Sequence, residues 1–145
     1  MIRTVARALL IQQDSVLAVK YSDADGDLYA LPGGGQLERE PLRQCLEREC
    51  REELGVAVDI GAMLFVAEWI DPERAIHQVE FIFRCAAPLI GHITSVVPDS
   101  GQVAVEWLPL PAVMDCRLYH LEMRALLPVL ARGVDPSPAY LGFSR

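Results

Sequence analysis

The spacing of apolar and polar positions divides the chain into short strands and helices, without internal repeats or linkers. Apolar or alternating stretches bounded by turn residues predict strands at residues 4–11, 16–21, 28–31, 56–70, 76–86 and 102–108. The first two are expected to pair as a hairpin across residues 12–15. Gly61 lies within residues 56–70, so that segment is expected to form one long strand or two short ones.

Three further segments have helical character. Residues 41–54 predict an amphipathic helix that ends at Gly55, a natural C-terminal cap. Residues 110–114 predict one helical turn, and residues 118–130 a second amphipathic helix that Pro128 kinks or shortens. We expect a single domain over residues 1–134. The tail, residues 135–145, is expected to be disordered or to pack on the core or on a partner subunit.

The helix predicted over residues 41–54 carries its charges in an unexpected place. With about 100° of rotation per residue, one stripe of this helix holds Leu42, Cys45, Leu46 and Cys50. Glu49 and Glu53 continue the same stripe, and Glu52 borders it. A solvated helix would place its carboxylates opposite its apolar residues. These glutamates are therefore predicted to point inward, where a carboxylate needs a partner or a metal.

The three glutamates also repel one another, because positions i, i+3 and i+4 share a helix face. Each close pair costs about 1 kcal/mol in water and roughly 4 kcal/mol at a protein surface, and a cation between the carboxylates offsets that cost. A glycine run just upstream, Gly33 to Gly35, lets backbone approach a ligand closely. Together these features favour magnesium and a phosphate substrate. The alternative, a surface helix held by pairs such as Glu47 with Arg51, leaves the inward direction of the glutamates unexplained.

Residues 34–56 resemble the Nudix box, the pattern G-x5-E-x7-R-E-U-x-E-E-x-G-U in which U is aliphatic. Its fixed positions are filled here by Gly34, Glu40, Arg48, Glu49, Cys50, Glu52, Glu53, Gly55 and Val56, and the preceding Leu31, Pro32 and Gly33 are also typical of the family. Two positions depart from the pattern. Cys50 fills an aliphatic position, where a small buried thiol behaves as a hydrophobic residue. Arg39 stands where many members have glycine, which stiffens or re-aims the loop.

The resemblance implies the Nudix fold, of class α/β (α+β), with a mixed β-sheet sandwiched between helices. It also implies a Mg²⁺-dependent hydrolase that directs water at a phosphorus of a nucleoside diphosphate linked to another group. Mn²⁺ is a possible substitute. Under this resemblance Glu49 and Glu53 are the principal metal ligands, and Glu52 is a further ligand or the base. A backbone carbonyl of Gly33 or Gly34 would complete the metal shell.

The resemblance further implies that Arg48 orients a glutamate, either Glu40 or Glu53. The alternative role for Arg48 is a surface ion pair, which an arginine on a helix more commonly forms. The expected catalytic residues are thus Glu52, Glu49 and Arg48, and the expected substrate contacts are Gly33, Gly34, Gly35 and Arg39.

Several substrates remain open. Pro72 lies 16 residues after Val56, an offset associated in the family with ADP-ribose hydrolysis, although an Asp-Pro turn alone would also select proline. The competing substrates are nucleoside triphosphates, dinucleoside polyphosphates and other sugar nucleotides.

Two other function classes compete with hydrolysis. A non-catalytic, nucleotide-binding regulatory module of this fold is expected to lose box glutamates, and this chain keeps all four. A calcium-stabilised structural module is disfavoured, because a calcium loop spaces its oxygens along irregular backbone.

Other residues are weaker candidates. Further acids that could act as base or ligand are Asp99, Glu106 and Glu80, each expected to be an ordinary strand or loop acid. Histidines without ligand spacing are His77, His92 and His120. Aromatic residues that could stack on a base, but that more often belong to a core, are Trp69, Trp107, Tyr21 and Tyr29.

Composition adds expectations about domain number, partners and location. A chain of 145 residues suits one domain, as a monomer or homodimer. Its net charge of −7 disfavours a nucleic-acid polymer but not a small nucleotide, because a bound divalent ion inverts the local field. Four cysteines without metal or redox spacing predict reduced thiols and a cytoplasmic location. No stretch reaches the ~20 apolar residues of a membrane span, so no membrane partner is expected.

Overall fold

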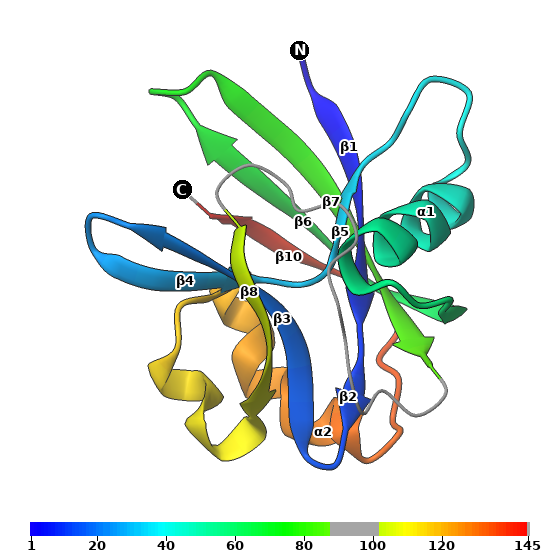
Figure 1. Ribbon diagram of the computed structural model, residues 1–145, viewed down its shortest axis with the longest axis vertical. Coiled ribbons are helices and arrows are strands. Elements are labelled where there is room, and N and C mark those ends of the chain that lie inside the picture. The colour runs from blue at the N-terminus through cyan, green and yellow to red at the C-terminus, as the bar shows by residue number, and fades with distance from the viewer. Residues whose placement is uncertain (88–101, 145) are drawn as a thin grey trace.

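Two curved five-stranded sheets form the centre of the computed structural model, which describes residues 1–87 and 102–144 (Figure 1). The order across the first sheet is β10 (Ala139–Ser144), β6 (Asp59–Asp71), β7 (Ile76–Ala86), β1 (Arg3–Leu9) and β5 (Gly33–Gly35). The second sheet has the order β2 (Ile11–Gln12), β3 (Ser15–Asp23), β4 (Gly26–Ala30) and β9 (Leu118–Tyr119), and β8 (Gln102–Pro109) also pairs with β3. Both sheets are mixed, because β1 runs parallel to β7 and β4 parallel to β9.

Helical elements cover the two sides of this assembly. The helix α1 (Leu42–Leu54) lies on one side, and η1 (Leu110–Asp115), η2 (Leu121–Leu126) and α2 (Leu127–Ala131) lie on the other. Strand alternation separates the two cores: Val16 and Ala18 pack with the C-terminal helical turns, whereas Leu17 packs under α1. The predicted arrangement of a mixed sheet between helices is confirmed.

Most of the predicted elements are present, and β7 has the predicted bounds. The segment around Gly61 forms one strand, β6, whose pairing with β7 shifts register between Ile60 and Phe65. The predicted loose region at residues 88–101, with His92 and Asp99, lies outside the described residues. Among the described residues, no helix has the length and apolar character needed to cross a membrane.

The prediction of one helix over residues 118–130 is wrong in its length. Only Leu127–Ala131 is α-helical, after a strand and a 3-10 helix. A continuous helix would need an N–H at residue 128 to donate to the Arg124 carbonyl, and Pro128 has none. Leu118 and Tyr119 instead pair with β4, which draws the start of the segment into the second sheet.

The tail forms the edge strand β10 beside β6. The Tyr140 hydroxyl donates to Glu68, which fastens this strand to its neighbour. The proposed division of the chain at residue 134 stays a prediction.

Candidate active site

The helix α1 presents two carboxylates to the interior. It begins after Pro41 and ends at Gly55, whose φ of 69° is the left-handed conformation that glycine tolerates best. Cys45, Leu46 and Cys50 are fully buried, and Glu49 and Glu53 follow on the same face with exposed fractions of 8% and 1%. The prediction that this stripe turns from apolar to acidic while facing inward is therefore confirmed.

Glu53 is held by hydrogen bonds from two distant segments. Its carboxylate accepts one from the Gly33 backbone N–H at 2.7 Å and one from Gln102 Nε2 at 2.7 Å. Burial raises the pKa of Glu53 to about 7, against the opposing effects of these two donors and of Arg7. The negative charge of Glu49 pushes the Glu53 pKa in the same upward direction. The two buried carboxylates thus repel each other, as expected for side chains that share a cation.

Arg48 gathers the remaining box glutamates. Its guanidinium donates two hydrogen bonds to Glu40, at 2.8 and 2.9 Å, and one to Glu49 at 2.9 Å. It also contacts Glu52 at 3.3 Å and the Gly35 carbonyl at 3.1 Å. Hydrogen bonding to Arg48 lowers the pKa of Glu40 to about 2 although burial opposes this. Of the two partners that the sequence left open for Arg48, the structure places Glu40 against it.

The glycine strand β5 lies directly beside these carboxylates. Gly33 has a φ of 145°, and a Cβ there would lie 1.9 Å from the Ala6 carbonyl oxygen. A Cβ on Gly34 would lie 2.4 Å from the carboxyl carbon of Glu49. The position of Gly33 therefore requires glycine, and a side chain at Gly34 would displace the Glu49 carboxylate.

Arg7 holds the glycine strand in place through hydrogen bonds. The sequence analysis assigned Arg7 no role. It donates to the carbonyls of Leu31 at 3.2 Å and Gly33 at 3.4 Å, and to Glu80 at 3.0 Å. Glu80 in turn lies 2.6 Å from Nε2 of the buried His120. The one signal in the sequence was a charged residue in the middle of an apolar strand.

Glu80 keeps its negative charge inside the protein. Burial favours its neutral form, but the charge of Arg7 and the hydrogen bond with His120 outweigh this effect and lower its pKa to about 2. Glu80 thus serves this buried network, on strand β7.

A hollow opens above the glycine strand. It measures about 370 Å³ and is lined by Gly33, Gly34, Gly35, Val5, Tyr21, Gln78 and the side chains of Arg3 and Arg7. The two arginines supply positive charge next to the glycine backbone, which a ligand in the hollow can approach closely. This combination suits a phosphate group.

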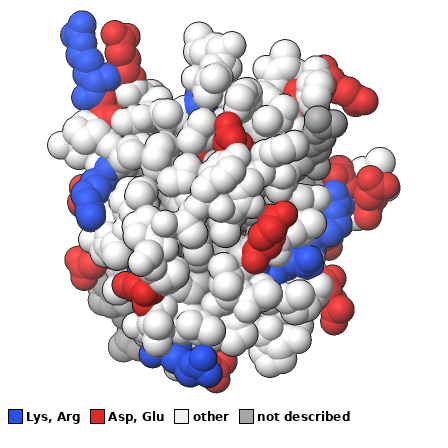
Figure 2. All heavy atoms as spheres, turned by 180° about the vertical axis from the view of Figure 1, so that it is seen from behind, with Lys and Arg blue, Asp and Glu red and all other residues white. Residues whose placement is uncertain are grey.

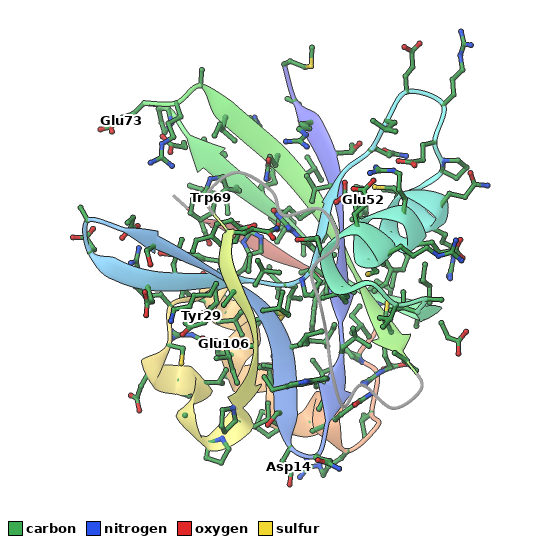
Figure 3. The ribbon with its side chains drawn as sticks, in the orientation of Figure 1. Asp14, Tyr29, Glu52, Trp69, Glu73 and Glu106 are labelled. Atoms are coloured by element: carbon green, nitrogen blue, oxygen red, sulfur yellow. The ribbon has the colours of Figure 1, made fainter. Side chains whose placement is uncertain are left out.

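The other candidates lie outside the hollow or away from Glu49, Glu52 and Glu53. Arg39 is exposed in the loop before α1, with a φ of 64°, and does not line the hollow. Glu106 contacts Lys20 and Tyr29, and His77 contacts Glu68. Figure 3 shows Glu106 and Tyr29 far from Glu52, which lies on α1 beside β5. Trp107 packs in the core under α1.

The acidic site suits a hard cation in its chemistry. Its donors are carboxylate and carbonyl oxygens, the ligands that Mg²⁺ prefers. Within residues 1–87 and 102–144, no three acid, histidine or cysteine side chains already surround one point. Arg48 Nη1 contacts both Glu49 and Glu52. The repulsion between Glu49 and Glu53 and the close fit of Gly34 against Glu49 both fit a cation held there.

Charges elsewhere on the protein are mixed. On the face shown in Figure 2, lysine and arginine side chains are interspersed with acidic ones around a largely uncharged centre.

Comparisons with known proteins agree on one family. A family model described as the NUDIX domain matches residues 1–130. A MutT NUDIX hydrolase from Burkholderia pseudomallei is 28% identical, with 77% of this chain and 85% of that chain covered and a TM-score of 0.65. Two solved structures below 25% identity share the fold. A MutT protein from Methanosarcina mazei is 15% identical, with coverage of 91% and 94% and a TM-score of 0.71. An ADP-ribose pyrophosphatase from Streptococcus suis is 23% identical, with coverage of 95% and 98% and a TM-score of 0.64. A search of curated protein sequences gave no match.

Proposed function

The chain belongs to the Nudix family of pyrophosphohydrolases, and we propose that it uses Mg²⁺ to hydrolyse the pyrophosphate linkage of a nucleoside diphosphate joined to another group. Hydrolases of this family use divalent cations and act on small nucleotides. The observation that carries the proposal is the pair of buried carboxylates, Glu49 and Glu53, beside the backbone of Gly33 and Gly34. Burying two carboxylates side by side is costly unless a cation belongs between them.

Glu49, Glu53, Glu52 and the Gly34 carbonyl would hold the cation. When bound, a divalent ion lowers the pKa of a coordinated water and neutralises charge on the phosphate. The choice of Mg²⁺, with Mn²⁺ as a substitute, follows from the all-oxygen donor set.

The protein's own groups orient this site. The Gly33 N–H and Gln102 hold Glu53 in place, and Arg48 holds Glu49 and Glu52. Glu52 has the most exposed carboxylate of the three, with 39% of its side chain accessible. We therefore assign to Glu52 the role of the base that accepts the proton of the attacking water. Its place at the edge of the site suits exchange of that proton with solvent.

The substrate phosphates would lie in the hollow above Gly33, Gly34 and Gly35. Arg3 and Arg7 line this hollow and would balance the negative charge that the substrate brings. Arg39 remains a proposed contact for a part of the substrate that extends beyond the hollow.

ADP-ribose is the substrate that we favour within this class. The Streptococcus suis neighbour is described as an ADP-ribose pyrophosphatase, and another neighbour as a UDP-X diphosphatase. Pro72 lies in the turn between β6 and β7, where Asp71 Oδ1 accepts hydrogen bonds from the N–H groups of Glu73 and Arg74. That turn geometry alone explains the proline, so the preference is slight.

A screen of nucleotide derivatives tests the proposal. With millimolar Mg²⁺ we expect ADP-ribose to yield AMP and ribose phosphate, separated by chromatography, with a higher kcat/KM than ATP or a dinucleoside polyphosphate. The matched control is the same reaction in excess chelator. Tight nucleotide binding without products, whichever divalent ion is supplied, would contradict hydrolysis and support a regulatory module instead.

Thermal unfolding gives an independent prediction. An ion that binds only the folded state at 100 times its Kd stabilises it by about 2.7 kcal/mol, roughly 5–10 °C in Tm for a domain of this size. We expect Mg²⁺ to raise the Tm of the wild-type protein by this order and NaCl of equal ionic strength to raise it far less. Equal shifts from the two salts would count against a metal site on α1.

A further inference from the structure

The two arginines that line the hollow above β5 differ in what surrounds their charges. Arg7 donates to two backbone carbonyls and forms an ion pair with Glu80 at 3.0 Å, so that Glu80 offsets much of its charge. The guanidinium of Arg3 has no hydrogen-bond or ion-pair partner within residues 1–87 and 102–144. Arg3 is therefore the main source of net positive charge in this hollow.

The absence of a side chain at Gly35 gives the Arg3 guanidinium its place. A Cβ on Gly35 would lie 2.1 Å from Arg3 Nη2 and 2.4 Å from Arg3 Nε. The guanidinium thus lies against the backbone of β5, in the space that a side chain would fill. Arg3, Val5 and Arg7 alternate along β1 and share one face, and all three line the hollow. Arg3 consequently presents its charge at the Gly35 end of the hollow.

The backbone of Gly35 is fixed by three contacts. Gly35 pairs with Val5 of β1, and the next peptide N–H along the chain donates to the Thr4 carbonyl at 3.0 Å. The Gly35 carbonyl accepts a hydrogen bond from Arg48 at 3.1 Å. A side chain at position 35 would therefore displace the flexible end of Arg3 and leave the strand where it is.

We propose that Arg3 binds a phosphate group of the substrate, and that Gly35 contributes to the affinity by seating the Arg3 guanidinium. The inference rests on the proposed function for the identity of the ligand. The planar fork of a guanidinium donates two parallel hydrogen bonds to phosphate oxygens. Arg3 gives up no internal ion pair when it does so, whereas the donors of Arg7 are committed to Glu80 and to the backbone.

Calorimetric titration with α,β-methylene-ADP in the presence of Mg²⁺ tests this binding without turnover, because the carbon bridge between the two phosphorus atoms cannot be hydrolysed. We expect Arg3→Gln to raise the dissociation constant at least about tenfold, the scale of one lost hydrogen bond between charged groups. Equal dissociation constants for the wild type and Arg3→Gln, or no binding to the wild type, would overturn the inference.

The matched control for the charge is Arg132→Gln. It removes the same charge from an exposed position at the end of α2, on the side of the sheets opposite α1. Its dissociation constant should stay close to that of the wild type, because salt screens a distant charge. Equal increases in Arg3→Gln and Arg132→Gln would show that net charge alone sets the affinity, which would also overturn the inference.

Gly35→Ala supplies the second arm. Its methyl group should weaken the binding of the same ligand by displacing the Arg3 guanidinium, and its Tm should stay close to that of the wild type. In the Arg3→Gln background the same substitution should have no further effect on binding, because the group that it displaces is gone. Unchanged affinity in Gly35→Ala, or losses that add in the double variant, would refute the seating role of Gly35.

The outcomes separate this inference from the hydrolase proposal. Binding that depends on Arg3, without hydrolysis of any nucleotide, would refute the hydrolase and leave the phosphate site standing. Hydrolysis of a nucleotide, with equal affinity of the wild type and Arg3→Gln for α,β-methylene-ADP, would do the reverse. If Gly35→Ala does not fold, the comparison of Arg3→Gln with Arg132→Gln decides alone.

Discussion

Glu53→Gln is expected to lower turnover by at least about 10²-fold, the scale of removing one oriented charged group from a reaction centre. The change keeps the shape of the side chain and removes its negative charge. A glutamine oxygen can still accept from the Gly33 N–H, and Gln102 can turn its amide to accept from the new nitrogen. Burial of a neutral amide is also less costly than burial of the carboxylate. We therefore expect the folded state to survive without metal.

The matched control for this variant is Glu47→Gln, the same substitution on the exposed side of the same helix. It should leave both turnover and Tm close to wild type. Initial rates at saturating Mg²⁺, with circular dichroism melts of both variants, give the comparison. Glu53→Gln should also lose the Mg²⁺-induced rise in Tm. Turnover within a few-fold of wild type would remove Glu53 from the metal site.

Glu80→Gln is expected to give the largest loss of stability, about 3–5 kcal/mol of unfolding free energy at pH 7, because it leaves buried partners without their anion. Glu80 accepts from Arg7 at 3.0 Å and lies 2.6 Å from His120, and the side chains of all three are at most 14% exposed. Stability of this order is a large share of the 5–15 kcal/mol typical of a domain. Urea unfolding at equilibrium measures the loss.

The pH dependence of that loss follows from the pKa of Glu80. The folded protein lowers this pKa from 4.5 to about 2, so the stabilisation is complete above pH 4.5 and is lost as pH falls from 4.5 towards 2. Arg7 from β1, His120 before η2 and Gln78 on the same strand are the partners involved. We expect the difference in stability between the wild type and Glu80→Gln to shrink as pH falls below 4.5 and to vanish only at about pH 2 and below.

Glu106→Gln is the control for this comparison, because Glu106 also carries an ion pair, with Lys20, but is 37% exposed. It should change stability little, since water and salt screen exposed pairs. A loss from Glu80→Gln no larger than that from Glu106→Gln would show that the buried network contributes nothing. A difference from wild type that does not shrink as pH falls from 4.5 to 2 would show that the stabilisation does not depend on the charge of Glu80.

The local pattern of apolar residues was sufficient to predict most helices and strands. It was insufficient where a helical periodicity competes with pairing to a distant strand. Strong alternation made β7 predictable to the residue. The helical pattern after residue 118 was misleading because Pro128 interrupts the hydrogen-bond ladder and β4 offers Leu118 and Tyr119 a strand partner. The alternation of apolar residues could not reveal that partner, which is 89 positions away from both Leu118 and Tyr119.

The amino-acid sequence alone determined the acidic face of α1 and the position of the glycine run before it, because both depend on spacing within residues 33–56. The glycine run was expected to be a loop, and its pairing with β1 as strand β5 came only from the structure. Only the tertiary structure decided what surrounds them. Gln102 reaches Glu53 across 49 positions, and Arg7 reaches Glu80 across 73. The cavity lined by Tyr29, Trp69 and Tyr119 is built from strands of both sheets. Such contacts depend on strand order and register, which no local periodicity encodes.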